Sequence, residues 1–332
     1  METKTALITG ITGQDGSFLA EYLLSKNYEV YGMVRRLSQP NLKNIRRLID
    51  KDRVTLIGGD LADQSSIVNA IKESQPDELY NLAAQSFVGE SWNQVELTLN
   101  LSGLGAIRVY EAARMVKNYL GKDIKIYQAS SSEMYGLSKE NDGTQNENTP
   151  MHPRSPYAVA KLMAHEAARV YRESYGMWIS TGICFNHSGP RRGIEFVSRK
   201  ISDGVARIKL GMAKELVLGN INTKRDWSYA GDMVEGMWMV LNKADKADDF
   251  VLASGESHSV KEFAELAFDY TDLNWELYTK FDKRLERPAE IFELKGDCRK
   301  ARDLLGWVPK VSFRKLVELM VDNDLRILKN KE

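Results

Sequence analysis

Strand-like and helix-like stretches alternate along the first half of the chain. Short apolar runs that predict buried strands occupy residues 4–10, 28–34, 53–58, 78–84, 124–130 and 178–186. Between them, apolar residues at helical spacing predict helices at 15–26, 64–74, 96–117 and 156–175. Strands separated by helices form parallel β-α-β units, so the pattern predicts an α/β fold: a doubly wound parallel sheet with helices on both faces.

The alternation ends after residue 186. Basic residues and glycines gather at 190–200 and 219–226, and an amphipathic pattern near 312–328 predicts a C-terminal helix. We therefore expect a second, smaller and partly discontinuous C-terminal domain that closes over the first and binds the substrate. The predicted boundaries are 1–185 plus about 223–251 for the large domain, and about 186–222 plus 252–332 for the small one.

A glycine motif lies between the first predicted strand and the first predicted helix. Gly10, Gly13 and Gly16 form G-x-x-G-x-x-G. Such glycines permit a tight turn, a close backbone approach to a pyrophosphate and close packing of helix on strand. The helix N-terminus also directs N–H groups at the phosphates. The position of this motif makes it a dinucleotide site of Rossmann type rather than an ordinary turn.

The residues after the second strand indicate which dinucleotide binds. NAD enzymes commonly place an acid there for the ribose 2′-hydroxyl, whereas this chain has Arg35 and Arg36. A guanidinium complements a 2′-phosphate, so we expect NADP as the cofactor. Asp60 and Leu61 follow the third strand and are expected near the adenine.

Tyr157 and Lys161 form Y-x-x-x-K in the helix after the fifth strand. Their i, i+4 spacing places both side chains on one helix face. A phenol with a pKa near ~10 is a poor base, but a neighbouring ammonium and a cationic nicotinamide favour the phenolate. Behind a dinucleotide motif, this pair predicts a base that takes a hydroxyl proton while hydride leaves the same carbon.

The fifth strand ends in S-S-S-E-M-Y-G. Ser131 is placed to orient the reacting hydroxyl, and Glu133 is expected on the same side of the extended segment. A plain dehydrogenase needs no second proton-transfer group. Glu133 therefore suggests that a carbon acid is deprotonated or a hydroxyl is expelled, unless the carboxylate only caps the nearby loop.

Composition excludes several other classes. Lys and Arg total 46, as do Asp and Glu, so no basic excess indicates a nucleic-acid partner. The two cysteines lie far apart, no metal-ligand spacing is present, and histidines such as His152, His165 and His258 are expected to be surface or packing residues. No signal peptide or apolar run of about 18 residues is evident. We expect a cytoplasmic protein with no membrane or metal.

Several motifs together resemble one known family. The segments 9–24 (TGITGQDGSFLAEYLL), 128–136 (QASSSEMYG), 153–161 (PRSPYAVAK), 185–193 (FNHSGPRRG) and 224–227 (KRDW) are similar to the GDP-mannose 4,6-dehydratases, a branch of the extended short-chain dehydrogenase/reductases. The resemblance runs over nearly the whole chain. It implies bound NADP, a GDP-sugar substrate with GDP-mannose first, and a homo-oligomer, dimer or tetramer, assembled near Arg35 to Asn41.

The resemblance also implies roles for individual residues. The catalytic set falls on Ser131, Glu133, Tyr157 and Lys161. With the motif readings above, the cofactor set comprises Gly10, Ile11, Thr12, Gly13, Gln14, Asp15, Gly16, Arg35, Arg36, Asp60, Leu61, Leu82, Ala83, Ala84, Ser86, Tyr157, Lys161, His187 and Arg192. The substrate set comprises Ser86, Glu133, Asn186, Lys200, Arg225 and Arg287, of which Lys200, Arg225 and Arg287 are expected at the diphosphate.

Three departures from the family pattern concern the sugar more than the chemistry. Ser131 stands where the family usually has threonine, Ser188-Gly189-Pro190 replaces the usual Glu-Ser-Pro, and the helix after Lys161 is less family-like. The alternatives are a GDP-heptose 4,6-dehydratase, or a GDP-4-keto-6-deoxysugar reductase or epimerase. A non-catalytic protein of this fold would not need all four catalytic residues.

Overall fold

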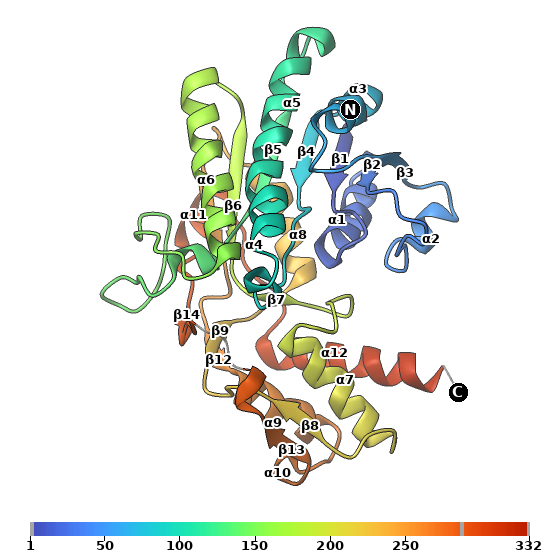
Figure 1. Ribbon diagram of the computed structural model, residues 1–332, viewed down its shortest axis with the longest axis vertical. Coiled ribbons are helices and arrows are strands. Elements are labelled where there is room, and N and C mark those ends of the chain that lie inside the picture. Colours follow the sequence, from blue (N-terminus) through green and yellow to red (C-terminus); the bar gives the residue numbers. More distant parts are fainter. Residues whose placement is uncertain (1–2, 286–288, 331–332) are drawn as a thin grey trace.

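The computed structural model describes residues 3–285 and 289–330 and contains a large and a small domain (Figure 1). The large domain is organised around a parallel seven-stranded sheet of order β11-β6-β5-β4-β1-β2-β3. Its strands are β1 (Thr5–Thr9), β2 (Glu29–Val34), β3 (Thr55–Gly58), β4 (Glu78–Asn81), β5 (Lys125–Ser131), β6 (Ile179–Cys184) and β11 (Asp249–Leu252). The order reverses direction beside β1, as in doubly wound sheets, and the predicted fold class is confirmed.

Helices cover both faces of this sheet because successive strand residues point to opposite sides. Tyr80 and Tyr127 face the helices α1 (Gln14–Ser25), α8 (Ala230–Asn242) and α11 (Arg299–Leu305). Leu79 and Ile126, one position earlier, face α3 (Gln64–Ser74), α5 (Gly105–Leu120) and α6 (Pro156–Tyr175). The short helix α2 (Arg46–Ile49) lies between β2 and β3 along the chain.

The helix predicted over 96–117 differs in its first turns. It comprises α4 (Val95–Thr98), the π-helical segment η2 (Leu99–Leu104) and α5. Gly103 packs against α6 so closely that a Cβ there would lie 2.9 Å from the sulfur of Met163 and 3.3 Å from the carbonyl oxygen of Ala160. The wider turn thus accompanies tight packing next to the catalytic helix, a feature often found at functional sites.

The small domain forms its own core from α7 (Val197–Lys209), α9 (Val260–Tyr270) and α12 (Phe313–Lys329). Short paired strands flank this core. They are β8 (Leu216–Leu218) with β13 (Thr279–Phe281), and β9 (Lys224–Asp226) with β12 (Ser257–Ser259) and β14 (Glu293–Leu294). The pair β7 (His187–Ser188) and β10 (Ser228–Tyr229) lies where the domains meet. The remaining short helices of the whole structure are η1 (Glu90–Trp92), η3 (Ser132–Tyr135), α10 (Trp275–Tyr278) and η4 (Lys283–Leu285).

The chain returns to the large domain before its last helix. Ala301, Leu305 and Trp307 lie in the core between the sheet and α8, although the sequence grouped them with the small domain. The indole nitrogen of Trp307 donates to the backbone oxygen of Asp232 at 2.9 Å, and the Asp232 carboxylate accepts from the backbone of Lys310 and Val311. The small domain is therefore built from separate chain segments, and its exact boundaries stay a prediction.

The described residues lack two features: a membrane-spanning helix and a metal-binding cluster. Over 3–285 and 289–330, none of the helices combines the length and apolarity required to cross a membrane. The same residues contain no group of three or more His, Cys, Asp or Glu side chains placed to hold a metal ion.

Candidate active site

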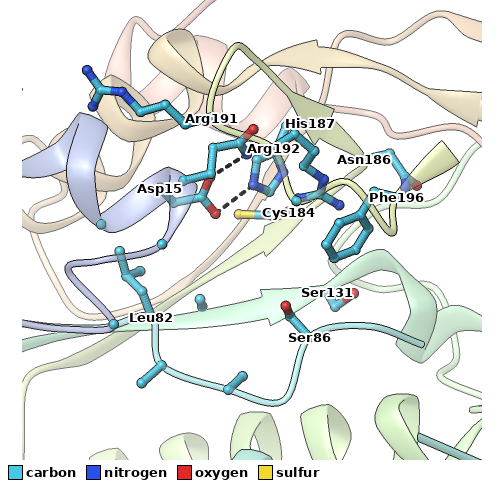
Figure 2. Close-up of a pocket in the computed structure, with 18 of the residues that line it drawn as sticks. Asp15, Leu82, Ser86, Ser131, Cys184, Asn186, His187, Arg191, Arg192 and Phe196 are labelled. Atoms are coloured by element: carbon cyan, nitrogen blue, oxygen red, sulfur yellow. Dashed lines mark hydrogen bonds and ion pairs between the residues drawn. The ribbon is translucent and has the colours of Figure 1, made fainter. Parts of the chain in front are cut away.

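A cavity of about 760 Å³ opens at the carboxyl ends of β1, β4, β5 and β6, where doubly wound sheets bind ligands. The structure brings most of the predicted residues to it. Those that line it are Gly10, Thr12, Gly13, Gln14, Asp15, Gly16, Leu82, Ala83, Ala84, Ser86, Ser131, Glu133, Tyr157, Lys161, Asn186, His187 and Arg192. Figure 2 shows Ser86 and Ser131 across the cavity from Asp15, His187 and Arg192.

The other predicted site residues do not line this cavity. Ile11 lies in the hydrophobic core, and Leu61 is buried against Gly105. Arg35 and Arg36 are exposed, whereas Asp60 is half-buried and its carboxylate accepts from the backbone of Ala62. Two substrate candidates lie outside the lining: Lys200 is half-buried on α7, and Arg225 is buried in β9. The third, Arg287, falls outside the described residues.

Arg225 is tied into the small domain by its own strand. Its guanidinium donates to the backbone oxygens of Lys224 and Ile291, the latter at 2.8 Å, and pairs with Glu290 at 3.3 Å. Sequence reasoning could not anticipate this, because the partners come from a segment about 65 residues further along the chain.

The glycine turn leaves the space that a dinucleotide needs. Gly10 has φ +73°, and a Cβ on it would lie 2.9 Å from the backbone of Ala83. A Cβ on Gly16 would lie 2.3 Å from the carbonyl oxygen of Gly10. The turn therefore brings the N-terminus of α1 against the neighbouring strand end with bare backbone facing the cavity, which suits a pyrophosphate. The residues present fit a dinucleotide cofactor.

Other lining residues were missed from the sequence. Asn41, Lys43 and Asn44 reach the cavity from the segment after β2, and the Asn44 amide donates to the backbone oxygen of Thr12 at 3.0 Å. Arg191, Phe196 and Arg199 also line it. The only signal for either group was its nearness to a recognised motif, since the residue types alone are those of ordinary surface loops.

The catalytic candidates converge at the end of β5. The Ser131 hydroxyl accepts from the backbone N–H of Glu133 at 3.3 Å and hydrogen-bonds to the phenol of Tyr157. Burial raises the pKa of Tyr157 above its ordinary value, the bond to Ser131 opposes this, and the charge of Glu133 adds to it. Burial also lowers the pKa of Lys161 to about 8. In the protein alone the phenol therefore stays neutral while Lys161 keeps its proton below about pH 8, and a cationic ring beside them would favour the phenolate.

The helix start fixes where Tyr157 lies. The side chain of Ser155 caps α6 by accepting from the backbone of Ala158, and Pro156 occupies the first turn, where its missing N–H costs nothing. One turn further on, the ammonium of Lys161 donates to the carbonyl oxygen of Ala129 on β5 at 2.8 Å. Tyr157 and Lys161 are thus held at the positions their spacing predicts.

A chain of buried hydrogen bonds runs from the glycine turn to this lysine. The backbone N–H groups of Leu82 and Ala83 donate to the hydroxyl of Thr9, which donates to Asn81 at 2.7 Å. Asn81 donates to Gln128 at 2.7 Å, and Gln128 donates to the same Ala129 carbonyl that accepts from Lys161. This chain crosses β1, β4 and β5 and couples the cofactor turn to the catalytic helix.

Across the cavity, His187 lies between two acceptors. Its Nδ1 is 2.7 Å from the backbone oxygen of Phe185, and its Nε2 is 2.8 Å from the carboxylate of Asp15. Burial would raise the pKa of Asp15, but the charge and hydrogen bond of His187 bring it to about 2 (Figure 2). Beside them, Arg192 stacks on the ring of Phe196 at 3.7 Å. The cavity thus holds a fixed carboxylate and a guanidinium.

The loop that carries Arg192 is attached to both domains. Arg191 pairs with Glu21 of α1 at 2.7 Å. Arg199 donates to the carbonyl oxygens of Pro190 and Arg192 and pairs with Asp324 of α12 at 2.6 Å. The loop position therefore depends on contacts from the cofactor helix and from the C-terminal helix together.

A glycine turn at the edge of a doubly wound sheet, with Tyr157 and Lys161 at its catalytic end, defines a protein of the short-chain dehydrogenase/reductase class. A family model described as GDP-mannose 4,6 dehydratase matches residues 7–320. GDP-mannose 4,6 dehydratase 1 of Arabidopsis thaliana is 48% identical over 99% of this chain and 92% of that protein. The human GDP-mannose 4,6 dehydratase is 43% identical over 98% of this chain and 92% of its own length. The chain belongs to the GDP-mannose 4,6-dehydratase family, and the resemblance is confirmed.

Solved structures agree on the fold. The chain superposes with a TM-score of 0.80 on RMD from Pseudomonas aeruginosa complexed with NADPH, at 24% identity over 98% of this chain and 100% of that one. It superposes with a TM-score of 0.83 on DesIV, a dTDP-glucose 4,6-dehydratase from Streptomyces venezuelae with NAD and TYD bound, at 23% identity over 98% of each chain. At this identity the likeness shows the shared architecture.

Proposed function

We propose that the protein is an NADP-dependent GDP-mannose 4,6-dehydratase that forms GDP-4-keto-6-deoxymannose and water. One observation carries the proposal: Glu133 lies beside Ser131 and Tyr157 in the cavity that the dinucleotide turn also lines. A simple oxidation or reduction at C4 needs Ser131 and Tyr157, whereas removal of a proton at C5 needs a second base.

The residues divide the reaction as follows. Ser131 orients the 4-hydroxyl of the sugar, and Tyr157 takes its proton. When bound, NADP would supply the hydride chemistry, acceptance from C4 and donation to C6. The 4-ketone makes the C5 proton acidic, and Glu133 removes that proton and passes it to the departing 6-hydroxyl, which leaves as water. A proton returns to C5 and balances the one taken by Tyr157. The hydride removed from C4 ends on C6, so the overall reaction is redox-neutral.

The same assignment gives the other residues their places. The segment from Gly10 to Gly16, which includes Asp15, would hold the pyrophosphate end of the cofactor. Arg192 would contact its nicotinamide half. The preference for NADP over NAD rests on the basic segment after β2, which contains Lys43 in addition to Arg35 and Arg36. Lys200, Arg225 and Arg287 stay candidates for the diphosphate. Lys200 and Arg225 lie outside the lining, so both would have to reach it through movement of the small domain.

The assembly and the compartment are also part of the proposal. Exposed apolar side chains gather on α5 and α6, among them Met115, Tyr119, Val170 and Tyr175. Apolar side chains gathered on neighbouring helices are typical of protein interfaces. This face supports a homo-oligomer, dimer or tetramer, and light scattering of the purified protein measures its size. We propose a cytoplasmic location because the two cysteines lie far apart in the sequence, which fits a reducing compartment.

Incubation of purified protein with GDP-mannose, without added cofactor, tests the function. Mass spectrometry should detect a product lighter by one water, because the cofactor is regenerated in each turnover and remains bound. GDP-heptose is the parallel substrate, since Ser188-Gly189-Pro190 borders the sugar region. A folded protein with bound NADP that dehydrates neither sugar contradicts the proposal.

Glu133→Gln separates dehydration from oxidation. The amide cannot take the C5 proton, so water loss should fall about 10²–10⁴-fold. Oxidation at C4 uses Ser131 and Tyr157, so NADPH absorbance should still appear when the sugar is added. If the variant dehydrates at the normal rate, Glu133 is not the base and the mechanism fails.

A further inference from the structure

His165 lies one helical turn beyond Lys161 on α6 and was expected to be a packing or surface residue. Its side chain is buried, with the residue 6% exposed, and it takes part in a polar network instead. Tyr157, Lys161 and His165 follow each other at i, i+4 and i+8, so all three face β5. Lys161 meets the carbonyl of Ala129, and His165 meets the next residue of the strand, Ser130.

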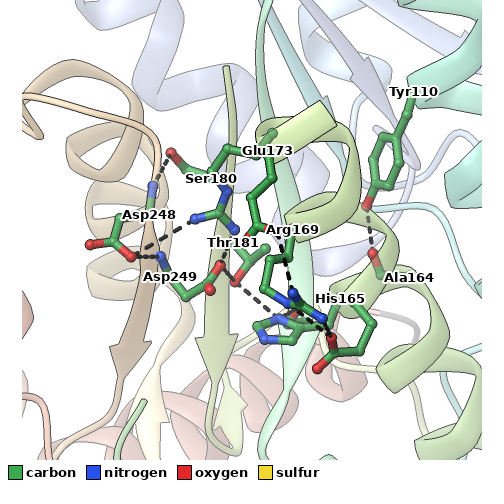
Figure 3. A network of polar contacts seen from close by, with 12 residues as sticks. Tyr110, Ala164, His165, Arg169, Glu173, Ser180, Thr181, Asp248 and Asp249 are labelled. Carbon is green, nitrogen blue, oxygen red and sulfur yellow. Dashed lines mark hydrogen bonds and ion pairs between the residues drawn. The ribbon is translucent and has the colours of Figure 1, made fainter. Parts of the chain in front are cut away.

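The network links His165 to Thr181 and Asp249 (Figure 3), and it extends to an ion pair at one end and to a residue of the cavity lining at the other. Arg172 pairs with Asp249 of β11 at 2.7 Å, and the hydroxyl of Thr181 on β6 donates to the same carboxylate oxygen at 2.9 Å. Nδ1 of His165 lies 3.2 Å from that hydroxyl and 3.0 Å from the hydroxyl of Ser130. Ser130 is itself part of the cavity lining.

Donor and acceptor chemistry fixes the direction of these bonds. Arginine only donates and a carboxylate only accepts, so the hydroxyl of Thr181 must donate its hydrogen to Asp249. What Thr181 presents to the imidazole is therefore a lone pair, and Nδ1 must carry a hydrogen to be compatible with it. The same Nδ1–H lies within reach of Ser130, whose oxygen accepts. The hydrogen of Ser130 is then left to point away from the imidazole.

We propose that His165 is a positioning residue, which holds Ser130 as an oriented hydroxyl donor in the wall of the active-site cavity. The acceptor is an uncharged oxygen at the catalytic end of the ligands, on the nicotinamide half of the cofactor or on the sugar. The proposal rests on the proposed function for the presence of these ligands. It adds a fifth side chain to the catalytic end, between the Ala129 carbonyl and Ser131.

The buried surroundings agree with a neutral ring. Burial lowers the pKa of His165, and the charges of Arg172 and Arg169 act in the same direction. The charges of Asp249 and Glu166 raise the pKa and outweigh those of the two arginines, but burial is the largest influence, so the pKa of His165 lies below its ordinary value. A neutral imidazole has one hydrogen, and the bond directions place it on Nδ1.

Nitrogen-15 NMR of histidine-labelled, cofactor-free protein tests the bond directions without any substrate. A neutral imidazole protonated at Nδ1 gives a distinct pair of ring-nitrogen shifts, and the loss of one pair in a His165→Asn variant assigns it. We expect the Nδ1–H form. A neutral His165 protonated at Nε2 overturns the proposal, because the hydroxyl of Ser130 would then donate its hydrogen to Nδ1 of the ring.

Two substitutions test the role at the site. Asparagine places its amide nitrogen near the position of Nδ1, whereas glutamine reaches the position of Nε2. His165→Asn should therefore keep the donor to Ser130 and behave within about twofold of wild type, while His165→Gln should resemble Ser130→Ala. One neutral hydrogen bond is worth about 0.5–1.5 kcal/mol, so both losses should be about 2- to 10-fold. His152→Gln, at an exposed histidine, is the matched control.

The affected constant identifies the acceptor. NADPH affinity, measured by fluorescence titration, falls if the cofactor accepts, and KM for GDP-mannose rises if the sugar accepts. The double variant Ser130→Ala/His165→Gln should lose no more than Ser130→Ala alone, because the two residues act as one unit. Ser130→Ala with both constants unchanged, or additive losses in the double variant, overturns the proposal.

Failure of this inference differs from failure of the proposed function. Absence of turnover by wild-type protein rejects the GDP-mannose assignment, whereas the tautomer and the NADPH titration are measured without sugar. If His165→Gln does not fold, the NMR measurement and Ser130→Ala still decide the outcome, since neither disturbs the imidazole.

Discussion

The two walls of the cavity are built differently. On the large-domain side, Thr9, Asn81, Gln128 and Lys161 are buried and joined by hydrogen bonds across three strands and a helix. On the other side, much of the lining comes from a loop, Pro190 to Phe196, which is held by a few side chains from α1, α7 and α12.

This difference separates chemistry from recognition. A catalytic group must be held within a fraction of an ångström of its working position, which a buried network on strands and helices achieves. A loop held by a few contacts can move with the small domain and admit a large ligand. We therefore expect substitutions on the first wall to change rates and those on the second to change stability and affinity.

Tyr157→Phe should have the largest effect. Phenylalanine fills the same space but cannot take the proton of the 4-hydroxyl, so the first oxidation should slow by about 10²–10⁴-fold. The appearance of NADPH absorbance after mixing with sugar measures that step. GDP-mannose binding, measured by calorimetry, should change little. A variant that oxidises the sugar at the normal rate would remove Tyr157 from the mechanism.

Asp324→Ala should have the next largest effect, and it acts on the loop. Asp324 is 1% exposed and holds Arg199 and the hydroxyl of Ser202. Its removal leaves a buried guanidinium without its partner, which costs about 3–5 kcal/mol. Chemical unfolding should show the loss, and KM should rise more than kcat falls.

Asp322→Ala is the control for this loss, because Asp322 lies on the same helix and, within 3–285 and 289–330, its carboxylate accepts only from the exposed hydroxyl of Tyr270. Equal stability of the two variants would mean that the ion pair under the loop contributes nothing. The comparison between the walls would then rest on activity alone.

Lys161→Met tests the first wall through stability, with a smaller effect. Lys161 holds its proton up to pH 10.5 in the unfolded chain but only to about 8 in the fold. The unfolded state therefore binds more protons between these values, and wild-type stability rises with pH across that window. Below pH 8 the full penalty applies, so the uncharged variant should be more stable at pH 7 by up to about 3 kcal/mol.

The gain should shrink as the pH rises from 8 to 10.5, while dehydratase activity is lost throughout. Thermal melts of cofactor-free protein over this range measure it. A variant less stable than wild type at pH 7 would show that the hydrogen bond to Ala129 outweighs the burial of the charge.

Local patterns explain which parts could be predicted. Six of the seven strands, the glycine turn and the Tyr157–Lys161 pair depend on spacing within about ten residues, and all are where the sequence placed them. The seventh strand, β11, was not predicted, and neither was the π-helical turn η2, which packs closely against α6. Family resemblance, not residue pattern, supplied the GDP-sugar.

Long-range contacts explain the rest. The sequence predicts Arg225 as a phosphate ligand but gives no sign that its guanidinium also donates to the backbone of Ile291. His165 looked like a packing residue, but Thr181 and Ser130 come from two other strands and give it a polar role. A single sequence gives no means of seeing which distant segment meets such a side chain.

The repeated crossing of the chain between its two domains limits how this enzyme can be recombined. The polypeptide leaves the sheet after β6, returns for α8 and β11, leaves again, and comes back with α11 and Trp307 before its final helix. A chimera that exchanges the small domain therefore needs several matched junctions, and truncation at any one point exposes core surface of the remainder. New sugar specificities are more readily reached by changing loop residues in place than by grafting a domain.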